Sequence, residues 1–127
     1  MVGNMLSRWT DFLNSDGEKE WRQRDEEFVD DIVSREELMG LWEKGWACLF
    51  GALEPLTAED FQKLIKIRDE DHTVPDAINR QLAHYAYHVG QIVSLGVIIK
   101  NQDWESLSIP KGKSGEFNDS MFSKTKD

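Results

Sequence analysis

The 127-residue chain has 24 acidic and 15 basic residues and a formal net charge of −9, and its 39% hydrophobic and 31% charged content indicates one soluble domain with a modest core. Nucleic-acid binding depends on clustered Lys and Arg, so this acidic balance argues against a nucleic-acid partner. The longest uncharged apolar stretch, Val89 to Ile99, has about half the residues of a bilayer span, so we expect no membrane partner. The N-terminus lacks the layout of a signal peptide, and Cys48 is a lone cysteine that cannot form an internal disulfide. We therefore expect a cytoplasmic protein.

The first predicted helix spans about residues 2–13. Its apolar side chains recur at helical spacing in one stripe that includes Met5, Trp9 and Phe12. The turn-rich Asn-Ser-Asp-Gly sequence that follows is expected to end the helix. Residues 18–33 contain many charged side chains and are predicted to form a polar connection.

The second predicted helix begins at a capping box, in which Ser34 is followed three residues later by Glu37. Apolar residues then recur at steps of three or four from Leu38 to Leu53, where a Glu-Pro-Leu-Thr sequence ends the helix. The segment at 63–72 is ambiguous between an extended connection and a weak helix, and we expect it to be irregular.

The third predicted helix is the longest. Thr73 and Asp76 form a second capping box around Pro75, and the helical pattern continues to about Asn101. Beyond it, residues 102–127 are rich in Ser, Gly and Lys, which indicates a C-terminal tail that is partly docked and partly disordered.

These helix lengths do not match. At a rise of 1.5 Å per residue the last helix is about 40 Å long and the first is under about 20 Å. A short helix beside two long ones leaves apolar surface exposed. We therefore expect either self-association, most simply as a two-fold homodimer that buries Trp and Met side chains, or the loss of a segment upstream of Met1.

Two histidines in the last helix are candidate metal ligands. His84 and His88 are four residues apart, which places them about 40° apart on one helical face. Helical bundles build metal sites from such inward side chains, and both ring nitrogens of an i, i+4 pair can reach one divalent ion. Two ligands alone are too few for a catalytic site, and ordinary core or surface histidines are the alternative.

Other polar residues have two possible interpretations each. His72 precedes a helix cap, where a loop or surface position is expected. Arg8, Arg22 and Arg24 either engage substrate carboxylates or face solvent. Gln91, one turn past the histidine pair, either bonds a metal-bound group or satisfies a buried backbone group.

The sequence "HYAYHVGQIVSL" resembles the final-helix signature of the DinB/YfiT-like superfamily of metal-binding four-helix bundles. In that signature a His, a second His four residues later and then x-Gly-Gln-Ile lie on one helix. The matching residues here are His84, His88, Gly90, Gln91 and Ile92. The segments "GNMLSRWTDFL", "EKEWRQRDEEF" and "SLSIPKGKS" are similar to those of an uncharacterised subgroup, so the resemblance covers most of the chain.

The resemblance implies an all-α, up-down helical bundle of the four-helix type, as one domain over residues 1–127, with the first family helix and part of the second absent. It also implies a mononuclear divalent metal site, most often nickel or zinc, held by three histidines. Two of these would be His84 and His88. The third would lie in a helix immediately before Met1, outside this chain.

Relatives in this superfamily include thiol transferases and isomerases that use low-molecular-weight thiols such as bacillithiol or mycothiol. A divalent ion lowers the pKa of a bound thiol and so generates a thiolate near neutral pH. The resemblance therefore implies a metal-dependent thiol S-transferase whose partners are a small-molecule thiol and an electrophile. The alternative is a non-enzymatic helical interaction protein with an incomplete or vestigial metal site, which the chain's five tryptophans and expected apolar surface favour.

Overall fold

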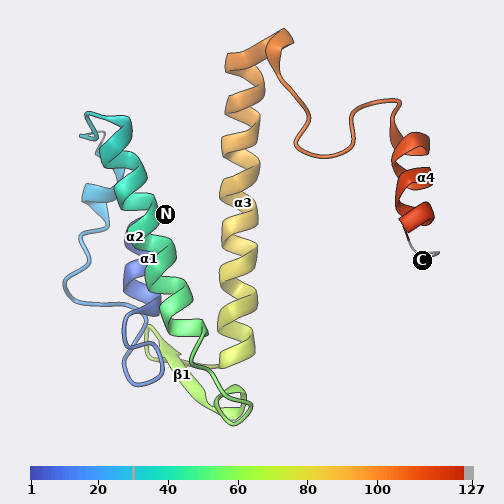
Figure 1. The fold of residues 1–127 in the computed structure, drawn as a ribbon. Helices are drawn as coiled ribbons and strands as arrows, with labels where there is room; N and C mark the ends of the chain where they lie inside the picture. Colours follow the sequence, from blue (N-terminus) through green and yellow to red (C-terminus); the bar gives the residue numbers. More distant parts are fainter. Residues whose placement is uncertain (30, 125–127) are drawn as a thin grey trace. The chain divides into compact units, whose positions relative to one another are not determined.

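The computed structural model describes residues 1–29 and 31–124, and within them it is mostly helical (Figure 1). The longer elements are α1 (Val2–Trp9), α2 (Arg35–Leu53), β1 (Leu64–Ile67), β2 (Glu70–Thr73), α3 (Val74–Lys100) and α4 (Ser114–Lys124). Three short 3₁₀ turns complete the order: η1 (Asp25–Phe28), η2 (Asp60–Gln62) and η3 (Asn101–Asp103). The chain forms two compact units, Met1–His88 and Val89–Asp127, which are described separately.

Helix α1 is shorter than the predicted 2–13. Thr10 has extended backbone angles and Asp11 has a positive φ of 48°, so the helix ends at Trp9, and the Thr10 amide makes the last helical bond, to the Leu6 carbonyl. The carbonyl of Asp11 instead accepts bonds from the backbone amides of Asn14 and Ser15, which close a tight turn. The apolar side chains predicted to form one stripe, Met5, Trp9 and Phe12, are all buried, although Phe12 lies outside the helix.

Helix α1 packs against α2 at a glycine. A Cβ atom added to Gly45 would lie 2.7 Å from the sulfur of Met5, closer than side chains tolerate, so glycine permits the two helices to approach.

Helix α2 begins and ends as predicted. The Ser34 hydroxyl accepts a bond from the Glu37 amide at 3.1 Å, and the Glu37 carboxylate accepts one from the Val33 amide.

The prediction of an irregular segment at 63–72 is wrong. Strands β1 and β2 pair antiparallel with Ile67 opposite Glu70, and the two residues between them, Arg68 and Asp69, have φ of 57° and 63°. Two positive φ angles define the type I′ hairpin turn, which normally shows itself through Asn-Gly or Asp-Gly. The Arg-Asp pair lacks that signal. The carboxylate of Asp16 compensates, because it accepts the amide hydrogens of both turn residues at 2.9 and 2.7 Å.

The core lies within Met1–His88. Its buried apolar members come from α1 and the turn after it, α2, β1 and the first half of α3: Met5, Trp9, Phe12, Leu49, Ile65, Ile67, Val74, Ala77 and Tyr85. Helix α3 starts at the predicted cap, where the Thr73 hydroxyl donates to the Asp76 carboxylate at 2.6 Å and accepts from the Asp76 amide at 3.2 Å. Burial raises the pKa of the Tyr85 hydroxyl above its ordinary value.

The unit that begins at Val89 contains no buried residue among positions 89–124. Helix α3 ends at Lys100, close to the predicted end, and Asn101 follows with a positive φ of 50°. The indole of Trp104 lies so close to α3 that a Cβ on Gly96 would be 2.9 Å from it. Helix α4 is not among the predicted elements; it lies within the tail at 102–127, whose last three residues, 125–127, lie outside the described residues.

Helix α3 and η3 together form one 30-residue helical segment with an 18-residue window of mean hydropathy 1.3. By length and composition alone this segment is long and apolar enough to cross a membrane. No Asp, Glu, Lys or Arg lies between Arg80 and Lys100, so the uncharged stretch is longer than the 89–99 considered in the sequence analysis, and the helix passes this test. Core helices of soluble proteins meet the same criterion, so the cytoplasmic location stays a prediction.

Candidate functional site

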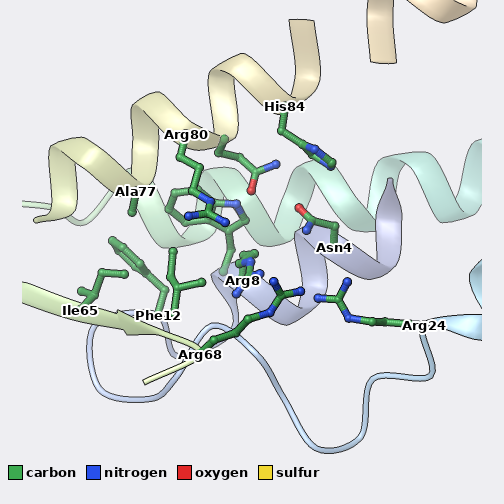
Figure 2. Close-up of a pocket in the computed structure, with 12 residues that line it drawn as sticks. Asn4, Arg8, Phe12, Arg24, Ile65, Arg68, Ala77, Arg80 and His84 are labelled. Atoms are coloured by element: carbon green, nitrogen blue, oxygen red, sulfur yellow. The ribbon is translucent and has the colours of Figure 1, made fainter. Parts of the chain in front are cut away.

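A cavity of about 210 Å³ lies in the first unit, among α1, β1 and the first turns of α3 (Figure 2). Its lining residues are Asn4, Arg8, Trp9, Phe12, Arg24, Ile65, Ile67, Arg68, Ala77, Arg80, Gln81 and His84. One part of the wall is apolar, with Phe12, Ile65 and Ala77 among its members. The other part is polar and cationic, which makes this cavity the candidate functional site.

Four arginines line the cavity, and each comes from a different part of the chain. Arg8 comes from α1, Arg24 from the polar connection, Arg68 from the hairpin turn and Arg80 from α3. In Figure 2 the side chains of Arg24 and Arg68 extend toward each other from opposite sides, next to Arg8. The fold therefore concentrates positive charge locally in a protein whose net charge is −9.

One carboxylate is shared by three of these arginines. Glu18 is bound by Arg24 in a two-pronged pair at 3.0 and 2.5 Å, by Arg68 at 3.3 Å and by Arg8 at 3.4 Å. The hydrogen bond from Arg24 is the main reason that the pKa of Glu18 lies below its ordinary value. Glu18 thus stays ionised and holds the arginines together, but it neutralises only one of their charges.

Arg8 is the most enclosed of the four. Its side chain is only 9% exposed, and its Nη1 atom has no hydrogen-bond partner among the described residues. Burial lowers the pKa of the Arg8 guanidinium, Glu18 opposes that shift, and Arg68 and Arg80 add to it. A guanidinium remains charged in spite of such shifts. A buried donor atom without a partner is costly, so Arg8 Nη1 is stabilised by an acceptor that enters the cavity, whether water or a ligand.

Two amide side chains of the cavity wall also have polar atoms without a hydrogen-bond partner among the described residues. Gln81 is 6% exposed, and neither its Nε2 atom nor the Oδ1 atom of Asn4 has a partner among residues 1–29 and 31–124. Arg80, one residue before Gln81, is exposed and makes no ion pair with any described residue. The cavity wall thus presents several uncommitted polar groups.

The predicted histidine pair lies at the edge of this cavity. His84 lines it, and the ring centroids of His84 and His88 are 4.6 Å apart, with ring planes at 88°. Both side chains are half-buried. Burial, followed by the proximity of His88, lowers the pKa of His84, which favours the neutral imidazole that a metal requires. The helix therefore brings the pair together as predicted.

A third protein ligand does not accompany the pair. Within the described parts of the chain, no group of three or more His, Cys, Asp or Glu side chains is arranged to hold a metal ion. The histidine pair is therefore a candidate metal site with two side chains from the described residues.

The other sequence candidates are divided between the cavity and elsewhere. Arg8 and Arg24 line the cavity, whereas Arg22 does not, and its guanidinium is paired with Glu27 at 2.6 and 3.1 Å. His72 lies on β2 rather than in a loop, with Nε2 3.9 Å from a Glu70 carboxylate oxygen. Gln91 belongs to the second unit.

Sequence reasoning missed two of the four arginines. Arg80 lies one helical turn before His84, so the shared face of α3 was a signal that could have identified it. Arg68 had no such signal, because its position depends on a hairpin that the sequence did not predict.

Comparison with known protein families gives a match over most of the chain. The family described as "Protein of unknown function (DUF1572)" matches residues 1–113. No curated protein and no solved structure matches the chain.

Proposed function

The chain belongs to the DUF1572 family, a family of unknown function, and on this premise we propose that it is a divalent-metal-binding helical protein related to the DinB/YfiT-like four-helix bundles. His84 and His88 are two of the ligands in this proposal. The observation that carries it is the pair of half-buried imidazoles, with ring centroids 4.6 Å apart, beside a polar cavity.

The geometry of the pair suits a borderline metal such as zinc or nickel. Imidazole nitrogens bind zinc at about 2.0–2.1 Å, and two rings this close on one helix are near enough for a nitrogen of each to bind the same ion. Because two ligands come from the chain, water, substrate or a group from a second chain completes the coordination. We therefore expect weak binding that is easily lost to chelators.

In the enzymatic form of the proposal, the protein is a metal-dependent thiol S-transferase in the cytoplasm. The metal would lower the pKa of a small-molecule thiol such as bacillithiol. The chain itself would contribute the cavity beside His84, in which arginines orient anionic groups and the apolar wall excludes water from the electrophile.

A non-enzymatic interaction protein is the second candidate, and a specific observation favours it. Helix α2 exposes large apolar side chains in the first unit: Leu38 at 49%, Met39 at 39% and Phe50 at 51%. Such surface is typical of a helix that packs against a partner, most simply a second copy in a two-fold homodimer. Sedimentation at micromolar concentration should then show a dimer; a compact monomer would contradict the homodimer.

The metal proposal is tested by calorimetry with nickel and with zinc on untagged protein at pH 7.5 and 5.5. Protons compete for neutral imidazoles, so affinity should fall at pH 5.5. The variants are His88→Ala and, as a matched control, His72→Ala, which removes a histidine outside the pair. Binding should be lost in the first and unchanged in the second. Equal affinity in all three proteins, or affinity independent of pH, would rule out this site.

A further inference from the structure

We propose that the arginine-lined cavity of the first unit is a binding site for a small organic dianion, a compact molecule that carries two carboxylates or one phosphate on a short carbon skeleton. The proposal goes beyond the metal site and does not depend on it. It stands on the charges, the unpaired donors and the size of the cavity.

The charge balance of the cavity indicates a dianion. Four guanidinium groups line it, and the nearby carboxylates are Glu18, which contacts three of them, and Asp16, which holds the backbone of the hairpin turn. Four positive charges less two negative charges leave two positive charges. Arg22 does not alter this balance, because Glu27 pairs with it.

The unpaired donors show where the anion binds. Arg8 Nη1 and Gln81 Nε2 are buried without partners among the described residues, although their side chains line the cavity. A planar guanidinium binds carboxylate or phosphate oxygens through two parallel N–H bonds, and such charge-assisted bonds are the strong ones. Arg80 makes no ion pair within the described residues, so its whole charge is available to a ligand.

The arrangement of the cationic wall is fixed before a ligand arrives. Asp16 anchors the hairpin turn that carries Arg68, and Glu18 bridges Arg8, Arg24 and Arg68. Groups already held in place lose less conformational entropy on binding. The internal carboxylates therefore organise the site as well as reducing its charge.

The size and the second wall define the rest of the ligand. The volume of the cavity is about 210 Å³. It lies below the roughly 300–1,000 Å³ of sites for drug-sized ligands, which argues against a nucleotide or a large cofactor. The apolar side chains of Phe12, Ile65 and Ala77 suit a short hydrocarbon segment between or beside the charged groups.

The test is calorimetry on metal-depleted protein with three probes: succinate, inorganic phosphate and acetate. Metal is removed on a chelating resin, because a soluble polycarboxylate chelator would itself compete for the site. We expect succinate or phosphate to bind about tenfold or more tightly than acetate, since the second charge engages a second guanidinium. Binding should weaken as salt is raised.

Two variants locate the binding. Arg80→Gln should weaken the binding of the dianion about tenfold or more. The matched control Arg35→Gln, on the exposed first turn of α2, should leave the affinity unchanged. Arg80 is exposed, so this change leaves the core intact. Gln81→Glu, which places a carboxylate in the cavity, should abolish binding, with circular dichroism confirming that the variant is folded.

The outcomes separate the two ligand classes and the two proposals. Preference for succinate assigns the site to dicarboxylates, and preference for phosphate assigns it to phosphate esters; each supports the dianion site. No binding of either probe, or equal binding by wild type and Arg80→Gln, overturns it. The same titration on the His88→Ala variant should be unchanged, so failure of the metal proposal leaves this result interpretable.

Discussion

The two halves of α3 have the same apolar periodicity but different surroundings. In the first half, Val74, Ala77 and Tyr85 are buried against the core of Met1–His88. In the second half, Ile92 and Leu95 recur at the same spacing, yet they are 53% and 58% exposed. Periodicity thus predicts an apolar face on a helix, whereas burial depends on what other segments supply to cover it.

The difference extends to the two units that share this helix. The first unit combines α1, α2 and the hairpin around the start of α3 and contains every member of the hydrophobic core. No residue at positions 89–124 is buried. The closest packing at a glycine in that range is the indole of Trp104 against Gly96. We infer that the stability of the fold depends mainly on the first unit.

Truncation of a core side chain should give the largest effect on stability. Met5 is fully buried, so Met5→Ala should lower the free energy of unfolding by about 2–5 kcal/mol. The matched change in the second unit, Ile92→Ala, should lower it by no more than about 0.5 kcal/mol, because that side chain is half exposed. Urea denaturation measures both. Similar losses would show that the second unit contributes equally.

A glycine pair in α2 tests the close contact between α1 and α2. Gly45→Ala places a Cβ 2.7 Å from the Met5 sulfur and should destabilise the first unit by about 1–3 kcal/mol. Gly40→Ala, in the same helix but with no atom within 4 Å of the added Cβ, should stabilise it by up to about 1 kcal/mol. Thermal unfolding followed by circular dichroism distinguishes the signs. Stabilisation by both changes would mean that the helices have room to separate.

The helix caps should have smaller effects. Thr73→Ala removes the hydroxyl that accepts a hydrogen bond from the Asp76 amide at the start of α3. Ser34→Ala removes the hydroxyl that accepts a hydrogen bond from the Glu37 amide at the start of α2. Each should cost about 1 kcal/mol. Thr57→Ser retains the hydroxyl that donates to Asp60 and serves as a neutral control. A loss well below this value at Thr73 would show that core packing alone holds the first half of α3.

The smallest expected effect is a pH dependence at the turn before β1. The hydrogen bond from Lys63, with those from the amide and hydroxyl of Thr57, lowers the pKa of Asp60 to about 2 from an ordinary value of 3.8. Because the folded-state pKa is the lower one, this stabilisation is present above pH 3.8 and is lost as pH falls toward 2. Acid unfolding of Asp60→Asn should lack that component. An unchanged acid profile would contradict the role of Asp60.

Local signals in the sequence are enough to locate the starts of α2 and α3. Ser34 and Thr73 are identifiable as caps because a hydroxyl followed three residues later by an acidic residue satisfies free amides within one turn. The shared face of His84 and His88 follows from helix geometry alone, and the structure confirms their proximity. The four-helix bundle and the metal stay predictions.

The tertiary structure alone decided the hairpin and the cationic cavity. Arg68 and Asp69 adopt positive φ angles that are uncommon for residues other than glycine, and Asp16, more than fifty positions earlier, stabilises them. Arg8, Arg24, Arg68 and Arg80 meet only after α1, the hairpin and α3 have packed together. Helix starts are determined by interactions within a few residues, whereas these contacts join residues far apart in the chain, so no local pattern contains them.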